Sequence, residues 1–128
     1  MHFVPLKDRV ILQIEGEKTL PLLQSLLTND VEKISDTQTI YALMLSPQGK
    51  FLFDMNIMLH EGQYLLDVHK ETHLDLMKKI KMYALRDKIS LTIREDLEIV
   101  QAFPALQTED VRPKLGKKVP FCKGFYFF

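Results

Sequence analysis

The sequence predicts an α+β fold in which a mostly antiparallel sheet carries two helices on one face. Two segments, residues 17–27 and 71–85, repeat apolar residues at three- and four-residue spacing, which is typical of amphipathic helices. Between and after them lie short segments in which apolar and polar residues alternate, as they do in half-buried strands. Tight turns join most of these strand segments, and such turns favour antiparallel pairing because parallel neighbours need longer crossovers.

Each strand is expected from its alternation and from the turn that bounds it. A hairpin is expected where Pro47, Gln48 and Gly49 separate two alternating segments, since proline and glycine favour tight turns. The expected strands, in chain order, are residues 10–15, 39–46, 50–60, 63–69, 89–94 and 97–100. The first helix is expected to end at residues 28–30, where Thr, Asn and Asp can satisfy free backbone groups.

Composition limits the domain organisation and the classes of partner. The chain has 128 residues, 46% of them hydrophobic, which is enough for one domain with its own core. We expect this domain to span residues 1–103 and residues 104–128 to form an irregular tail that ends in the apolar sequence FYFF. Seventeen basic and 17 acidic residues cancel, so the composition gives no direct signal for nucleic acid or for an anionic membrane.

The single cysteine and the N-terminal segment bear on location. Cys122 is the only cysteine, so the chain cannot form an internal disulfide. Proteins of reducing compartments commonly lack disulfides. Charged residues interrupt the first 16 residues, so no signal peptide or membrane span is expected there. These observations predict a cytoplasmic protein. Histidines and the lysines of segment 71–85 are expected to be solvated surface residues rather than metal ligands or phosphate contacts.

Five short segments together resemble one protein family. They are Arg9–Gly16 (RVILQIEG), Leu22–Val31 (LLQSLLTNDV), Tyr41–Asp54 (YALMLSPQGKFLFD), Tyr83–Ile89 (YALRDKI) and Asp110–Gly116 (DVRPKLG). In this order and spacing they resemble the N-terminal part of the folate-binding family that includes the glycine-cleavage T-protein (aminomethyltransferase) and YgfZ. The resemblance implies a ferredoxin-like half of the folate-binding domain, with tetrahydrofolate as its cofactor. It also implies that the chain is truncated relative to the family.

The two branches of this family differ after the hairpin glycine. The T-protein has adjacent carboxylates there, and the first is identified as the residue that organises methylene transfer to tetrahydrofolate. Phe53 occupies that position here and cannot ionise, so only Asp54 remains. The resemblance to the YgfZ-like branch is therefore preferred, and it implies a non-catalytic folate-binding protein that supports iron-sulfur enzymes or tRNA modification.

Three residues are the candidate folate contacts, and each also has a simpler interpretation. Tyr41 aligns with a family tyrosine that approaches folate, but it also fits ordinary strand packing. Met44 is at a position near the ligand in the family, although methionine on an alternating strand often fills a core. Asp54 could accept hydrogen bonds from a pterin or an amine, or simply be solvated.

Two functions other than non-catalytic folate binding stay open, and so does a homodimer. The chain could be a T-protein-like aminomethyltransferase homologue, which Phe53 disfavours, or a folded remnant that binds no folate. The YgfZ-like branch carries a K-G-C-Y-x-G-Q-E segment after a second half-domain, and this segment does not occur here. A homodimer is expected if a second copy replaces that second half-domain.

Overall fold

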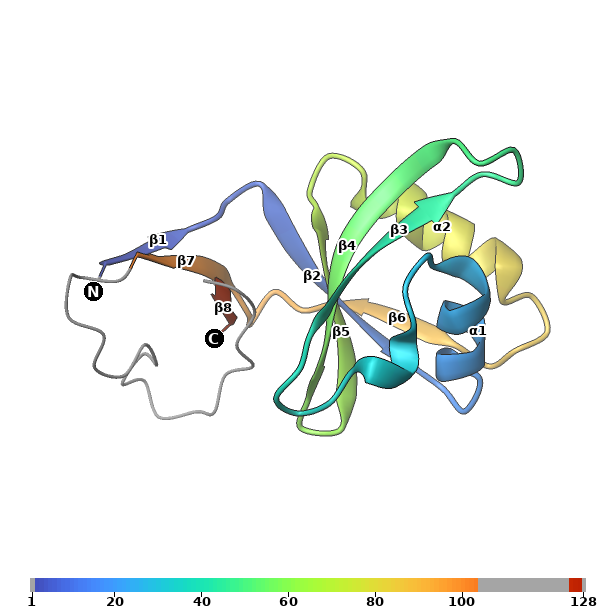
Figure 1. Cartoon of the computed structure of the whole chain (residues 1–128), viewed down its shortest axis with the longest axis horizontal. Helices are drawn as coiled ribbons and strands as arrows, with labels where there is room; N and C mark the ends of the chain where they lie inside the picture. Colours follow the sequence, from blue (N-terminus) through green and yellow to red (C-terminus); the bar gives the residue numbers. More distant parts are fainter. Residues whose placement is uncertain (1, 104–124, 128) are drawn as a thin grey trace.

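A computed structural model describes residues 2–103 and 125–127 (Figure 1). The elements are, in chain order, β1 (His2–Pro5), β2 (Arg9–Glu15), α1 (Thr19–Leu26), the 3₁₀ helix η1 (Val31–Lys33), β3 (Ile40–Leu45), β4 (Phe51–His60), β5 (Gln63–His69), α2 (His73–Tyr83), β6 (Ser90–Ile93), β7 (Ile99–Phe103) and β8 (Phe125–Phe127). The α+β class and the two helices agree with the sequence prediction. No helix among the described residues is long and apolar enough to cross a membrane.

The main sheet has five strands in the order β3-β4-β5-β2-β6, and every neighbouring pair is antiparallel. The register is regular through the centre, where Leu12 of β2 lies between Leu66 of β5 and Ile93 of β6. The predicted hairpin joins β3 to β4, and Gly49 adopts a φ of 85° in its turn. The turn closes through the N–H of Gly49, which donates to the carbonyl of Ser46 over 2.9 Å.

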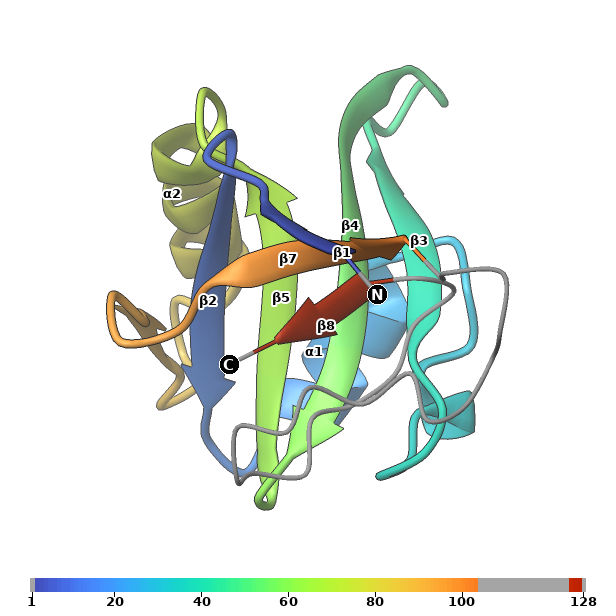
Figure 2. The same cartoon turned by 90° about the vertical axis from the view of Figure 1, so that its left-hand side faces the viewer.

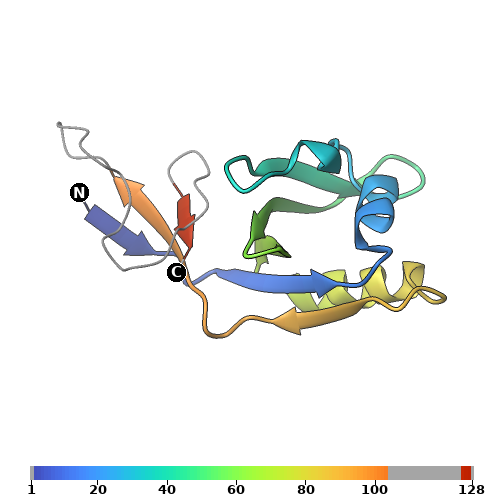
Figure 3. The same ribbon diagram turned by 90° about the horizontal axis from the view of Figure 1, so that it is seen from below.

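A three-stranded sheet of β1, β7 and β8 lies in front of the main sheet, on the side away from the helices (Figures 2 and 3). A small apolar cluster joins the chain leading into this sheet to the main one. It consists of Ile11, Met58, Leu65 and Ile99, with Leu6 and Leu97 packed against it. We call the side of the main sheet that carries this cluster the outer face.

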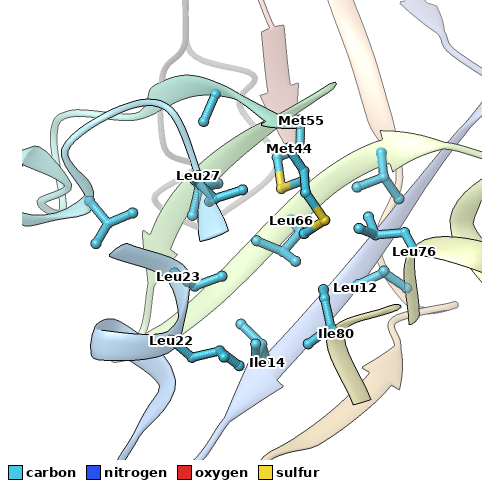
Figure 4. Packing of buried hydrophobic residues seen from close by; sticks show 14 of the residues in the cluster. Leu12, Ile14, Leu22, Leu23, Leu27, Met44, Met55, Leu66, Leu76 and Ile80 are labelled. Atoms are coloured by element: carbon cyan, nitrogen blue, oxygen red, sulfur yellow. The ribbon is translucent and has the colours of Figure 1, made fainter. Parts of the chain in front are cut away.

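The helices cover the opposite side of the main sheet, where the larger core lies (Figures 1 and 4). Leucines of α1 and apolar residues of α2 pack there on alternate residues of the strands. The fully buried side chains of this core include Leu12, Ile14, Leu23, Met55, Ile57, Leu66, Leu76 and Ile80. Alternation along each strand therefore divides the sheet into a helix side and an outer face.

The structure differs from the sequence prediction mainly at the chain ends. Strand β1 was not predicted, because His2–Pro5 is short and Pro5 is unfavourable in a strand that is paired on both sides. Residues 125–127 form β8, although the whole tail from residue 104 was predicted to be irregular. The sequence of β8 is entirely aromatic, and aromatic residues favour strands. The remaining tail residues 104–124 and 128, with Cys122 among them, lie outside the described part of the chain.

Candidate functional site

Six polar side chains from four neighbouring strands meet on the outer face. The sheet register explains their proximity, since Tyr41 pairs with Asn56, Asn56 pairs with Asp67, and Arg9 pairs with His69. Asp54 lies two residues before Asn56 on the same face of β4. We call these residues the outer-face cluster: Arg9, Tyr41, Asp54, Asn56, Asp67 and His69.

The buried base of the cluster is an ion pair between Arg9 and Asp67. Arg9 Nε donates to Asp67 Oδ1 over 2.6 Å, and the Asp67 side chain is only 2% exposed. Asn56 Nδ2 donates to Asp67 Oδ2 over 3.0 Å, so both carboxylate oxygens have partners. Burial raises the pKa of Asp67, while the hydrogen bonds from Arg9 and Asn56 oppose this rise. The ion pair fixes the guanidinium of Arg9, which also contacts the ring of His69.

The accessible part of the cluster is centred on Asp54. The phenol of Tyr41 donates to Asp54 Oδ2 over 2.7 Å, and His69 Nε2 lies 3.1 Å from Asp54 Oδ1. The hydrogen bond to Asp54 raises the pKa of Tyr41 above the ordinary tyrosine value, because it favours the protonated phenol. Arg9 Nη1 lies 3.1 Å from His69 Nε2 and links this part to the buried ion pair. A half-exposed aromatic ring therefore stands beside an oriented carboxylate and an imidazole.

The structure brings two of the three predicted site residues together and separates the third. Tyr41 and Asp54 are in direct contact on the outer face. Met44 is 2% exposed and lies in the core on the helix side, where the simpler interpretation of this residue placed it. We therefore leave Met44 out of the cluster.

Phe53 also packs against the helix-side core. A carboxylate at position 53 would point towards that core, whereas position 54 faces outwards. Phe53 and Asp54 therefore lie on opposite faces of β4, and only Asp54 belongs to the outer-face cluster.

The polar residues after α1 hold β3 in place beside the cluster. Asn29 Nδ2 donates to the carbonyl of Tyr41 over 3.0 Å, and the N–H of Thr28 donates to the carbonyl of Leu43 over 3.0 Å. Asp30 accepts a hydrogen bond from the N–H of Glu32 and caps the 3₁₀ helix η1. The residues predicted to end the first helix thus also fix the strand that carries Tyr41.

Sequence reasoning missed Arg9, Asn56, Asp67 and His69 as members of the cluster. One local signal was present, because Asp67 interrupts an apolar strand and a buried carboxylate needs a partner. The identity of that partner was not accessible from the pattern, since the Arg9–Asp67 contact joins residues 58 positions apart.

Two other features lie apart from the cluster. A pocket of about 360 Å³ lies beside the start of α1, and none of the residues that line it belongs to the cluster. Within residues 2–103 and 125–127, no three His, Cys, Asp or Glu side chains come close enough to hold a metal ion.

Comparisons with known proteins give relatives of two kinds. The chain is 33% identical over 125 residues to the mitochondrial iron-sulfur cluster assembly factor IBA57 homolog of Mycosarcoma maydis, a match that covers 87% of this chain and 30% of the relative. It is 25% identical to the aminomethyltransferase of Bacillus pumilus, with 90% of this chain and 32% of the relative covered. The chain thus spans about a third of the length of these relatives. No family model matches.

The fold has a solved counterpart. The glycine cleavage system aminomethyltransferase T from Bartonella henselae superposes with a TM-score of 0.66 at 16% sequence identity, over 77% of this chain and 27% of that one. At this identity the match shows a shared fold. Together with the relatives in sequence, it shows that the chain belongs to the family of YgfZ-like folate-binding proteins and glycine-cleavage T-proteins and corresponds to its N-terminal part.

Proposed function

We propose that the outer-face cluster binds a reduced folate and that the protein serves iron-sulfur cluster assembly without catalysing aminomethyl transfer. The contact between Tyr41 and Asp54 carries the folate part of this proposal. It sets a 54% exposed aromatic ring beside a carboxylate that is already oriented by two neighbours. A pterin offers a flat ring for stacking and N–H groups for a carboxylate, and both features suit this arrangement.

The iron-sulfur part of the proposal rests on the relatives. Proteins from Mycosarcoma maydis, Dictyostelium discoideum, Coccidioides immitis and Pyricularia oryzae that match between 69% and 92% of this chain are all named as iron-sulfur cluster assembly factors. Their names also say that they are mitochondrial, whereas a cytoplasmic location stays a prediction for this chain. A role in tRNA modification likewise stays a prediction.

Calorimetric titration with tetrahydrofolate tests the folate part. We expect saturable binding, and we expect Asp54→Asn to weaken it about tenfold or more because a hydrogen bond to a charged group is lost. Tyr41→Ala should weaken binding further by removing the ring. Asp75→Asn and Tyr83→Ala are matched controls on α2, and they should leave the affinity unchanged. A folded wild-type protein that gives no binding heat would contradict the proposal and favour a remnant without folate binding.

Iron-sulfur assembly needs a test in cells. In a host that lacks its own IBA57-type factor, expression of this chain should restore the activity of iron-sulfur enzymes, and Asp54→Asn should restore less. Equal rescue by Asp54→Asn, at equal protein level, would separate the iron-sulfur role from the outer-face cluster. No rescue by the wild-type chain would contradict the iron-sulfur role itself.

Aminomethyl transfer is the second candidate function, and one observation keeps it open. The carboxylate of Asp54 faces the same accessible side as Tyr41, whereas Phe53 faces the core. Transfer of a methylene group to tetrahydrofolate, measured with the other glycine-cleavage components, should be absent according to our proposal. Turnover that Asp54→Asn abolishes would instead support the enzyme.

A further inference from the structure

Strand β6 ends the main sheet with an unpaired edge. Among the described residues β6 pairs only with β2, in a register that sets Thr92 opposite Gln13. The N–H of Arg94 donates to the carbonyl of Ile11 over 2.8 Å and continues this ladder. Because backbone groups alternate along a strand, those of Leu91 and Ile93 point away from the sheet.

The opposite edge of the sheet is closed in a different way. Within the described chain, Thr28 both donates its N–H to the carbonyl of Leu43 and accepts from the N–H of Leu43 through Oγ1, at 3.0 and 2.9 Å. Asn29 covers the carbonyl of Tyr41. Open strand edges favour pairing with another chain, and proteins usually block the edges that should stay single. Strand β3 has such a block, whereas no described residue hydrogen-bonds to the outer edge of β6.

We infer that β6 pairs with β6 of a second copy, antiparallel and around a two-fold axis at Thr92. This register sets Leu91 opposite Ile93 of the second copy, and residues so placed exchange both backbone hydrogen bonds. The sequence of β6, SLTI, is rich in residues that favour strands, and Ile93 is 36% exposed in the single chain. The pairing joins the two main sheets into one continuous sheet.

Charges around β6 complement each other in this arrangement. Two exposed basic residues, Arg86 and Lys88, precede the strand with Asp87 between them. The exposed acidic residues Glu95 and Glu98 follow it, beside Arg94 and Asp96, which form an ion pair with each other. Antiparallel pairing sets the residues before β6 of one copy beside those that follow β6 of the other, and this happens twice because of the two-fold symmetry. Parallel pairing would instead bring like charges together. The charge pattern therefore favours a second copy of this chain in the antiparallel direction.

Sedimentation equilibrium of the 128-residue protein tests this inference. We expect a mass that rises with concentration from that of the 15.0 kDa chain to that of a dimer. Ile93→Pro removes an outward N–H and keeps the bonds to β2, so it should leave the protein folded by circular dichroism but monomeric. Ile93→Ala keeps the N–H and is the matched control; it should still form dimers.

Charge reversal gives a second test that does not depend on the fold of a proline variant. Lys88→Glu and Glu95→Lys should each weaken the dimer several-fold at low salt, and the two changes combined in one chain should restore it. A wild-type protein that stays monomeric at every concentration would overturn the inference. A dimer that neither Ile93→Pro nor charge reversal weakens would also overturn it, because its interface would then lie elsewhere.

Discussion

The two sides of the main sheet differ in chemistry although the same strands supply both. On the helix side, Leu66 and its neighbours form an apolar core. On the outer face, Asp67, the next residue along β5, anchors a network of charged and polar side chains. Because side chains alternate along a strand, one strand supplies both the core and the polar cluster that we propose binds folate. Substitutions at neighbouring positions can therefore separate these two roles.

The largest effect is expected from Asp67→Ala on the outer face. This change leaves the guanidinium of Arg9 without its buried partner and should lower the free energy of unfolding by about 3 kcal/mol or more. Urea unfolding followed by circular dichroism measures the change. Replacing both residues with apolar ones, as Arg9→Met with Asp67→Leu, should recover much of that loss. If Asp67→Ala unfolds at the wild-type urea concentration, the ion pair is not a structural base for the cluster.

Leu66→Ala tests the helix side at the adjacent position. Leu66 is completely buried, so its truncation should lower the free energy of unfolding by about 2–3 kcal/mol through a cavity in the core. The outer face should keep its geometry, and tetrahydrofolate affinity should stay within about twofold when the protein is folded. The same urea and calorimetric measurements apply. A large loss of affinity without unfolding would show that the two faces are coupled rather than separate.

Asp54→Asn should affect binding much more than stability. Asp54 lies at the accessible part of the cluster, so the expected change in unfolding free energy is below about 1 kcal/mol. The affinity for tetrahydrofolate should fall about tenfold or more, as proposed above. This pattern is the reverse of that expected for Leu66→Ala. Similar losses of stability in both variants would remove the distinction between the faces.

The smallest effect concerns the pH dependence of Tyr41. Its pKa is raised, chiefly by the hydrogen bond to Asp54, so the folded protein retains the phenol proton at a pH where the unfolded chain has lost it. The stabilising contribution of this hydrogen bond is complete below the ordinary tyrosine pKa and is lost as pH rises through the raised value. Ultraviolet titration of phenolate should show a late step from Tyr41 in the wild type. In Asp54→Asn that late step should move towards the ordinary range.

Local pattern predicted most of the main sheet and both helices. Alternation identified β2 to β6, and the spacing of leucines identified α1, because these signals depend only on near neighbours in sequence. Strand β8 was not predicted, since it pairs with β7 across more than 20 intervening residues. Pairing between strands that are so far apart in the chain produces no periodic pattern in the sequence.

The candidate site was predictable only in part. Tyr41 and Asp54 came from family resemblance, and the β3–β4 hairpin brings them together locally. Arg9 and His69 reach the cluster through the pairing of β2 with β5, which connects distant segments and cannot be read from a periodic pattern. Met44 was assigned with Tyr41 although the two residues are three positions apart, a spacing that sends their side chains to opposite faces of a strand.

The most direct test of the central claim is an NMR titration of the isotopically labelled protein with tetrahydrofolate. Our account predicts chemical-shift changes concentrated on the outer face, at the amide of Asp54, the side chain of Asn56 and the ring of His69. Resonances of α1 and α2 should stay in place. Changes confined to the helices, or no changes in a folded sample at millimolar ligand, would contradict the claim that the outer face is the folate-binding side of the sheet.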